Sequence, residues 1–336
     1  MSFLPYFHQV AGGQPLSREK AHQAMSILLE GHASEPQIAG FLVALRMRGE
    51  TAEELAGFAQ AMRDHMIAVD AGPGLVDTAG TGGDQSGTFN VSTVAAIVMA
   101  GAGAKVAKHG NRSLASQSGS ADVLEALGVR ISMSPEEAGE AIREIGLGFL
   151  FAPHMHPAMK HAQPVRRELK MRTAFNLLGP LANPARAEAQ VIGAPSLDTA
   201  HLMAQALHQL GTRHSFVVHG HDGLDEISTT GPTQVFEVTS AGLVKHVWTP
   251  EDFGVEKAHL ADLTGGDTAR NVDIAKAILA GEPGPKRNIV LVNAAAGLVA
   301  SGLADNLRAG VRRAAEAIDS GQSAQVLGRL QLRFPK

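Results

Sequence analysis

The sequence contains no cysteine, which excludes disulfide bridges, thiolate catalysis and cysteine-ligated zinc or iron–sulfur centres. It has no apolar run of about 18 residues, so no transmembrane helix is predicted. The N-terminal segment lacks the basic and apolar regions of a signal peptide, and we expect a cytoplasmic protein. Lys and Arg number 29 against 33 Asp and Glu, a net charge of −4. The chain therefore has no net positive charge that would attract nucleic acid or an anionic membrane.

The composition is otherwise that of a folded protein. The 336 residues are 44% apolar and 18% charged, close to the average of globular domains. This length suits one large domain or two, because a domain commonly has roughly 100–200 residues. Glycine is abundant, at 37 residues, and it is clustered. We expect the glycine clusters to carry the function.

Residues 1–70 are predicted to be helical. Ser34 and Gln37 form a capping box at the start of one helix, and Thr51 and Glu54 form another. After the first box, apolar residues recur at the spacing of one helix face: Ile38, Phe41, Leu42 and Leu45. No convincing strand precedes Leu75. These features indicate an all-helical N-terminal unit.

From Leu75 onward, short β-prone runs alternate with glycine-rich turns and helical stretches. The predicted strands cover residues 75–78, 105–108, 148–151, 189–192, 215–218 and 288–292. This alternation is typical of βα units around a mostly parallel sheet. Ligands of such sheets bind outside the carboxyl ends of the strands, where the glycine-rich turns are placed.

A helical segment from about Pro157 to Leu178 interrupts the series of strands. We expect it to pack against the N-terminal helices, which would make the smaller domain discontinuous. The predicted fold is thus α/β. A small helical domain comprises residues 1–70 and about 157–185, and a larger α/β domain with a mostly parallel central sheet comprises residues 71–156 and about 186–336.

The first candidate site follows the first predicted strand. It is the segment DTAGTGGD (Asp77–Asp84), and Thr88–Thr93 comes after it. Closely spaced glycines let a backbone approach a ligand and turn its N–H groups toward it, and Ser92 and Thr93 precede a helix whose N-terminus favours an anion. Asp84 beside a phosphate would need a cation or a hydroxyl partner. A tight turn that needs glycine for geometry alone is the alternative.

The second candidate site follows the next predicted strand and should lie beside the first. KHGNRS (Lys108–Ser113) combines a lysine, an arginine, an amide and a hydroxyl. Further small residues follow it closely: Ser116, Ser118, Gly119 and Ser120. Such a loop suits a phosphate and sugar hydroxyls. A solvated surface loop is the alternative, and His109 taken alone is more often structural than catalytic.

The third candidate site is the segment His219–Glu226, after the strand predicted at 215–218. The adjacent acids Asp225 and Glu226 suit magnesium, which takes one or two carboxylates together with water and substrate phosphates. A solvated acidic turn is the alternative. His219 and His221 suggest a transition metal, but without HExxH or cysteine the sequence disfavours zinc.

A fourth candidate lies on the helical segment, which carries Arg166, Arg167, Lys170 and Arg172. An exposed basic helix face explains such a stretch, and we accept that explanation for Arg167 and Lys170. One arginine directed at the cleft would offer a planar fork to a carboxylate.

Taken together, these motifs resemble those of the anthranilate phosphoribosyltransferase family, within the nucleoside-phosphorylase-like glycosyltransferases. The matching motifs occur in the family's order: GTGGD (Gly80–Asp84), TFNVST (Thr88–Thr93), KHGNRS (Lys108–Ser113), SGSADVLEALGV (Ser118–Val129), RTAFNLLGPLANP (Arg172–Pro184) and HDGLDEIS (His221–Ser228). The flanking helical pattern is compatible, so the resemblance covers nearly the whole chain. It varies at Gln85–Gly87.

The resemblance implies an enzyme of tryptophan biosynthesis that transfers a phosphoribosyl group from 5-phosphoribosyl 1-pyrophosphate (PRPP) to the amine of anthranilate. It implies that PRPP is held by Gly80, Gly83, Asp84, Thr88, Asn90, Ser92, Thr93, Lys108 and Ser120. The same two loops supply further candidates for PRPP: Val91, His109, Gly110, Asn111, Arg112, Ser113 and Ser116. The implied anthranilate contacts are Gly80, Asn111 and Arg166. Two magnesium ions are implied, with Ser92, Asp225 and Glu226 as their residues.

The resemblance also implies a homodimer joined through the helical domain. The amine of anthranilate is already neutral, so we assign no residue as a general acid or base. A pyrimidine nucleoside phosphorylase is the alternative enzyme, and a nucleic-acid-binding paralogue of the same fold is a non-enzymatic alternative. Association with a glutamine amidotransferase is left open by the sequence.

Overall fold

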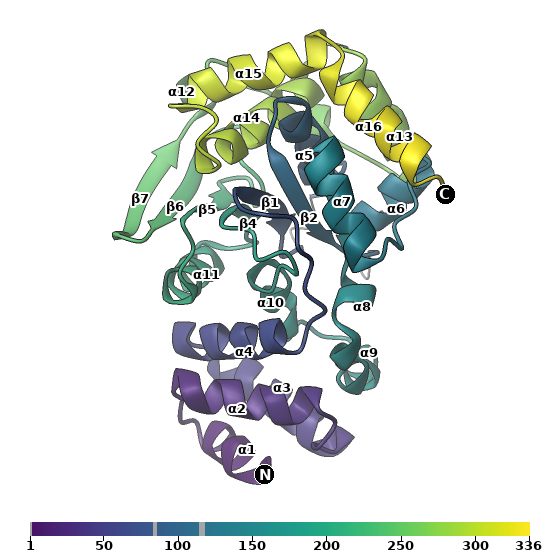
Figure 1. Ribbon diagram of the computed structural model, residues 1–336. Coiled ribbons are helices and arrows are strands. Elements are labelled where there is room, and N and C mark those ends of the chain that lie inside the picture. The colour runs from purple at the N-terminus through teal and green to yellow at the C-terminus, as the bar shows by residue number, and fades with distance from the viewer. Residues whose placement is uncertain (1, 83–85, 114–117) are drawn as a thin grey trace.

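The computed structural model describes residues 2–82, 86–113 and 118–336 (Figure 1). Within residues 2–82, four helices precede the first strand: α1 (Leu4–Ala11), α2 (Arg18–Leu29), α3 (Glu35–Arg48) and α4 (Ala52–Asp64). The Ser34 N–H donates to Gln37 at the start of α3, and the Thr51 and Glu54 groups bond each other at the start of α4. The predicted capping boxes and the helical N-terminus are thus confirmed.

The helical unit has its own aromatic core. The rings of Phe3 and Phe41 lie 5.1 Å apart, and those of Phe41 and Phe58 lie 6.0 Å apart, both edge to face. The predicted apolar stripe of α3, from Ile38 to Leu45, is buried against these rings. Burial of this stripe, more than helix propensity, stabilises so short a helix.

The larger unit is built on a seven-stranded sheet with the order β3-β2-β1-β4-β5-β6-β7. The strands are β1 (Leu75–Gly80), β2 (Lys105–Gly110), β3 (Leu147–Phe151), β4 (Ala189–Gly193), β5 (His214–Gly220), β6 (Thr233–Thr239) and β7 (Gly242–Trp248). Strands β1 to β5 are parallel, whereas β6 and β7 are antiparallel to their neighbours. The predicted fold class is confirmed.

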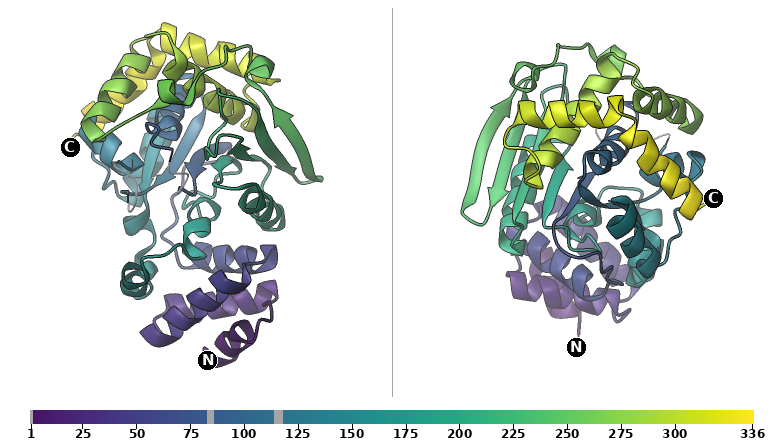
Figure 2. Two further views of the ribbon diagram at one scale, coloured as in Figure 1. Left: turned by 180° about the vertical axis from the view of Figure 1, so that it is seen from behind. Right: turned by 45° about the horizontal axis from the view of Figure 1, so that its top comes forward.

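Two details of the predicted sheet differ from the structure. The strand predicted at 288–292 is wrong, because these residues lie within α14 (Pro285–Ala300). An apolar run this short fits a buried helix as well as a strand, and Pro285 begins the helix. The hairpin of β6 and β7 was not predicted, and Figure 2 shows it at one edge of the molecule.

Helices cover both faces of the sheet. One face carries α14 together with α5 (Val91–Gly101), and α15 (Leu307–Asp319) and α16 (Gln322–Arg333) lie outside them. The edge near β3 carries α7 (Pro135–Ile145), and α6 (Ser120–Ala126) contacts α13 (Thr268–Leu279). On the other face, α11 (Leu197–Leu210) lies between the sheet and α4. Two short helices, α12 (Pro250–Phe253) and the 3₁₀ helix Leu260–Leu263, complete this part.

The segment between β3 and β4 is helical. It comprises α8 (Ala152–Met155), the 3₁₀ helix Pro157–His161, α9 (Gln163–Leu169) and α10 (Phe175–Leu181). Val165 and Phe175 belong to the same hydrophobic cluster as Phe41 of α3, and this cluster extends to Ile192 of β4 through α11. None of the helices in the described ranges is long and apolar enough to cross a membrane.

Candidate active site

The carboxyl ends of the parallel strands bring the predicted loops together. Gly80 at the end of β1 pairs with Gly193 at the end of β4, and Gly110 at the end of β2 pairs with Phe151 of β3. The loop with Asp225 follows β5 on the same edge. Three predicted site residues lie outside the described residues: Gly83, Asp84 and Ser116.

Asp225 is packed against both glycine strand ends. Its Oδ2 accepts a hydrogen bond of 3.0 Å from the Gly82 N–H. A Cβ at Gly80 would lie 2.5 Å from Asp225 Oδ2, and one at Gly193 would lie 1.5 Å from the Asp225 carbonyl oxygen. Only glycine leaves room for this contact, so these glycines are required for packing.

Glu226 reaches the first turn of α5. Its Oε1 accepts from the Ser92 N–H at 3.2 Å. The structure therefore brings together all three residues predicted for magnesium, Ser92, Asp225 and Glu226. The side chains of Val91 and Thr93 turn into the core instead, so a ligand could meet only their backbone. The buried Thr93 Oγ1 has no hydrogen-bond partner within the described structure.

Asn90 and Thr88 hold the first loop to segments that are distant in the chain. The Asn90 amide donates to Ser118 O at 3.1 Å, and its Oδ1 accepts from the Asn271 amide of α13 at 3.0 Å. Thr88 forms an isolated bridge with Thr264. Sequence reasoning missed Asn271, because nothing local marks a contact between residues so far apart in the chain.

A buried charged pair lies beneath the loops. Lys108 is 2% exposed and its Nζ donates to Thr78 O at 2.6 Å. Burial raises the pKa of Asp77 and lowers that of Lys108, and in each case the opposite charge opposes the shift. Asp77 accepts from the His109 N–H and from the Asn183 amide. The negative charge of Glu226 also opposes the lowering of the Lys108 pKa. The lysine charge therefore interacts with both carboxylates.

His109 points away from the loop ends. It is 7% exposed, its Nδ1 bonds Gly179 O at 2.9 Å, and its ring lies 5.1 Å from that of His156. Burial lowers the pKa of His109 to about 3, and the nearby His156 contributes. A ring that is neutral at pH 7 supplies no charge to a phosphate. This placement favours the structural explanation of His109.

The second loop is organised by Asp122 of α6. Arg112 bonds Asp122 Oδ1 at 2.9 Å and pairs with Glu125 at 3.0 Å, so its charge is already neutralised. The Ser113 N–H also donates to Asp122. Ser120 donates to the carbonyl oxygen of Asn111 at 3.3 Å, and its Oγ would lie 2.4 Å from a Cβ at Gly110.

The four basic residues of the helical segment have different surroundings. Arg167 and Lys170 are exposed, as expected. Arg166 is half-buried, and its guanidinium lies 5.3 Å from the centre of the Phe175 ring. Burial lowers the pKa of Arg166, and no carboxylate in the described ranges pairs with it. Its fork is thus available to an anionic ligand.

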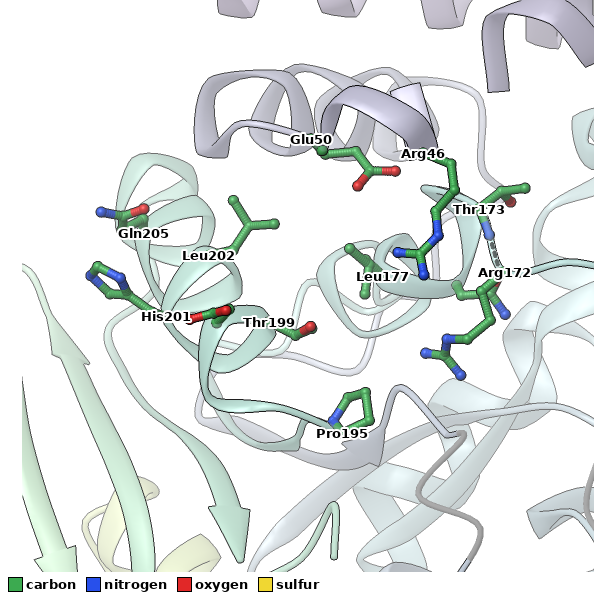
Figure 3. A pocket seen from close by; sticks show the side chains of 13 residues that line it. Arg46, Glu50, Arg172, Thr173, Leu177, Pro195, Thr199, His201, Leu202 and Gln205 are labelled. Atoms are coloured by element: carbon green, nitrogen blue, oxygen red, sulfur yellow. Dashed lines mark hydrogen bonds between the residues drawn. The ribbon is translucent and has the colours of Figure 1, made fainter. Parts of the chain in front are cut away.

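Arg172 belongs to the fourth candidate stretch, but only Arg166 of that stretch was assigned a role from the sequence. Its Nη1 donates to Gly82 O at 2.6 Å and its Nη2 to Thr81 O at 3.2 Å. Its position at the start of the RTAFNLLGP motif was the available signal. Arg172 also lines a cavity of about 430 Å³ between the end of α3, α10 and α11, where Arg46 and Glu50 point inward (Figure 3).

Asp225 and Glu226 fit a magnesium site completed by substrate. The described residues contain no group of three or more His, Cys, Asp or Glu side chains that could hold a metal. Magnesium does not require such a group, because it takes one or two carboxylates together with water and substrate phosphates. The two adjacent carboxylates match that requirement, and the helix N-terminus beside them favours the substrate phosphates.

Known proteins share this architecture over nearly the whole chain. A model described as the helical bundle domain of a glycosyl transferase family matches residues 4–66, and one described as the a/b domain of that family matches residues 72–324. An anthranilate phosphoribosyltransferase of Solibacter usitatus is 57% identical over 324 residues, which are 96% of this chain and 95% of that protein.

Solved structures agree. The anthranilate phosphoribosyltransferase of Thermus thermophilus is 44% identical and superposes with a TM-score of 0.92 over 97% of this chain and 98% of that one. The Saccharomyces cerevisiae enzyme, solved with PRPP and Mg, is 30% identical, with a TM-score of 0.90 over 98% and 97% of the two chains. The chain therefore belongs to the anthranilate phosphoribosyltransferase family of glycosyltransferases.

Proposed function

We propose that the chain transfers the phosphoribosyl group of PRPP to the amine of anthranilate, giving N-(5-phosphoribosyl)anthranilate and pyrophosphate in tryptophan biosynthesis. The observation that carries this proposal is the contact of Asp225 and Glu226 with the two backbone N–H groups of Gly82 and Ser92. This contact brings the acidic pair and the glycine-rich loop together at the carboxyl ends of the strands. The yeast relative was solved with PRPP and Mg and, separately, with 4-fluoroanthranilate.

PRPP is assigned to the two loops at the ends of β1 and β2. Gly80 and Ser92 lie at the first loop, and Asn90 is fixed there by two hydrogen bonds. Asn111 and Ser120 offer polar groups at the second loop. Two bound magnesium ions, held by Ser92, Asp225 and Glu226, would stabilise the negative charge on the departing pyrophosphate oxygen. Lys108 lies beneath the two loops and contributes through its positive charge, which balances the charges of Asp77 and Glu226.

Anthranilate is assigned to the part of the site that includes Arg166. The Arg166 guanidinium can receive the carboxylate as a planar fork, and its contact with Phe175 fixes the side chain. Asn111 and Gly80 would contact the rest of the ring. The anthranilate amine is neutral, so positioning and electrostatics are sufficient, and no residue is assigned as a base.

A homodimer joined through the helical domain completes the proposal. Apolar side chains of this domain are exposed, among them Met47 of α3 at 83% and Leu4 of α1 at 40%. Exposed apolar patches on a folded chain often mark association surfaces. The division into residues 1–70 with 157–185 and residues 71–156 with 186–336 stays a prediction, as does the cytoplasmic location.

A fluorescence assay tests the proposed reaction. Anthranilate emission should fall when the enzyme, PRPP and magnesium are all present, and it should stay constant when any one is omitted. The product should carry one phosphoribosyl group by mass. Emission that falls without PRPP, or that stays constant in the complete mixture, would contradict the proposal.

A further inference from the structure

Arg172 approaches the loop after β1 from the helical segment between β3 and β4. It lies between α9 and α10. Lys170 ends α9 in the left-handed conformation, with φ of 48°, and the Thr173 N–H donates to Asn176 Oδ1 at the start of α10. Phe175, the first residue of α10, is buried in the cluster that contains Phe41. The backbone at Arg172 is thus fixed to the helical core, while its guanidinium reaches the loop after β1.

The guanidinium and Asp225 hold one peptide group from opposite sides. Thr81 O accepts from Arg172 Nη2, and the Gly82 N–H of the same peptide donates to Asp225 Oδ2. In a trans peptide the carbonyl and the N–H point in opposite directions, so the two contacts fix the plane of this peptide without competing. A positive group faces the oxygen and a negative group faces the N–H, which matches the direction of the peptide dipole.

Two further contacts strengthen this arrangement. The Thr81 N–H donates to Gly193 O at 3.0 Å, and Arg172 Nη1 donates to Gly82 O. Gly82 adopts φ of +66°, a backbone conformation that residues other than glycine rarely adopt. Burial lowers the pKa of the Arg172 guanidinium and the charge of Asp225 opposes this, so the two charges interact across the peptide.

We propose that Arg172 is a positioning residue that holds the Thr81–Gly82 peptide in the shape required for PRPP, and that it joins this loop to the helical part of the chain. This proposal rests on the proposed function, because it concerns the same PRPP site. Arg172 touches neither substrate in this proposal. Its loss should therefore weaken PRPP use while leaving the anthranilate contacts of Arg166 intact.

The test compares Arg172→Ala and Arg172→Lys with Arg167→Ala, an exposed arginine of the same segment. Arg172→Ala should raise the KM for PRPP by about tenfold to a hundredfold, the usual effect of losing hydrogen bonds from a charged donor. The KM for anthranilate should hardly change. Arg172→Lys should recover part of the loss, because an ammonium can reach one carbonyl but lacks the fork. Arg167→Ala should match wild type.

Hydrogen exchange on the ligand-free enzyme gives a second readout, independent of turnover. The peptide that contains Gly82 should exchange faster in Arg172→Ala, and the rest of the sheet should keep the wild-type rate. An unchanged KM for PRPP, an equal rise of both KM values, or unchanged exchange at Gly82 would overturn the proposal. If wild type itself shows no PRPP-dependent reaction, the proposed function fails, and the exchange result still decides whether Arg172 holds the loop.

Discussion

Arg166 and its neighbour Arg167 differ in their surroundings, and that difference gives a sharp test of the anthranilate site. The guanidinium of Arg166 is half-buried over Phe175, whereas Arg167 is exposed. A charge-assisted fork contributes about 1.5–3 kcal/mol. We therefore expect Arg166→Ala to raise the KM for anthranilate roughly tenfold to a hundredfold, with little change in the KM for PRPP.

The matched control is Arg167→Ala, which should retain wild-type kinetics. Steady-state measurements with each substrate varied in turn give the KM values for anthranilate and PRPP that test this assignment. If Arg167→Ala raised the KM for anthranilate and Arg166→Ala did not, the carboxylate contact would belong to Arg167 instead of Arg166. If both variants were silent, a different group would hold the carboxylate.

The buried histidines His109 and His156 make the fold sensitive to acid. Burial lowers their pKa values to about 3 and about 4, below the value of about 6.5 for the unfolded chain. The unfolded chain therefore binds more protons, and stability is complete above pH 6.5 and declines as the pH falls toward these values. At pH 5 each histidine should cost about 2 kcal/mol of unfolding free energy.

Urea unfolding at pH 7.5 and pH 5 measures this effect. His156→Asn should show a smaller loss between the two pH values than wild type, because one proton-binding group is gone. His8→Gln, at an exposed position of α1, should show the wild-type loss. An equal pH dependence for wild type and His156→Asn would contradict the account.

At the scale of elements, the contact of β1 and β4 with the acidic loop depends on glycine. A Cβ at Gly193 would lie 1.5 Å from the Asp225 carbonyl oxygen. Gly193→Ala should displace the loop, lower the unfolding free energy by at least about 1–3 kcal/mol and weaken the magnesium-dependent reaction. Gly328 lies within α16, and a Cβ added there would meet no atom within 4 Å outside its own helix backbone. Gly328→Ala should therefore stabilise the fold by about 0.5–1 kcal/mol. Urea unfolding and rate measurements on both variants compare these outcomes.

Local patterns predicted the elements that depend on local signals. The capping groups at Ser34 and Thr51 predicted where α3 and α4 begin. Glycine-rich turns placed the ends of β1 and β2 at residues 78 and 108, two residues before their observed ends at Gly80 and Gly110. The apolar run at 288–292 misled the prediction, because burial on all sides removes the periodicity that separates helix from strand. The hairpin of β6 and β7 was missed altogether.

The site was predictable as a set of loops but not as a set of contacts. Sequence order placed Asp225 and Glu226 at the same sheet edge as Gly80 and Ser92. It gave no sign that Arg112 pairs with Asp122 and Glu125, or that Arg172 reaches Gly82. These contacts join segments that meet only once the sheet and helices are packed, so no local pattern encodes them.

At the scale of the whole molecule, the proposed dimer predicts a specific surface. Wild type should sediment as a dimer at micromolar concentration. Met47→Glu should shift it toward the monomer, because Met47 of α3 is 83% exposed and burial of a charge in an apolar interface is unfavourable. Leu332→Glu, 85% exposed on α16, should remain dimeric. A monomeric wild type, or a dimer broken by Leu332→Glu alone, would refute this interface.

The most direct test of the central claim is a magnesium titration of the anthranilate fluorescence assay. It compares wild type with the double variant Asp225→Asn, Glu226→Gln, which keeps the size of both side chains and removes their charge. If the strand-end loops bind PRPP through magnesium, wild type should consume anthranilate with a saturable magnesium requirement. The double variant should lose most of its turnover and need more magnesium, while it remains folded. Indistinguishable magnesium curves for the two proteins would contradict the account.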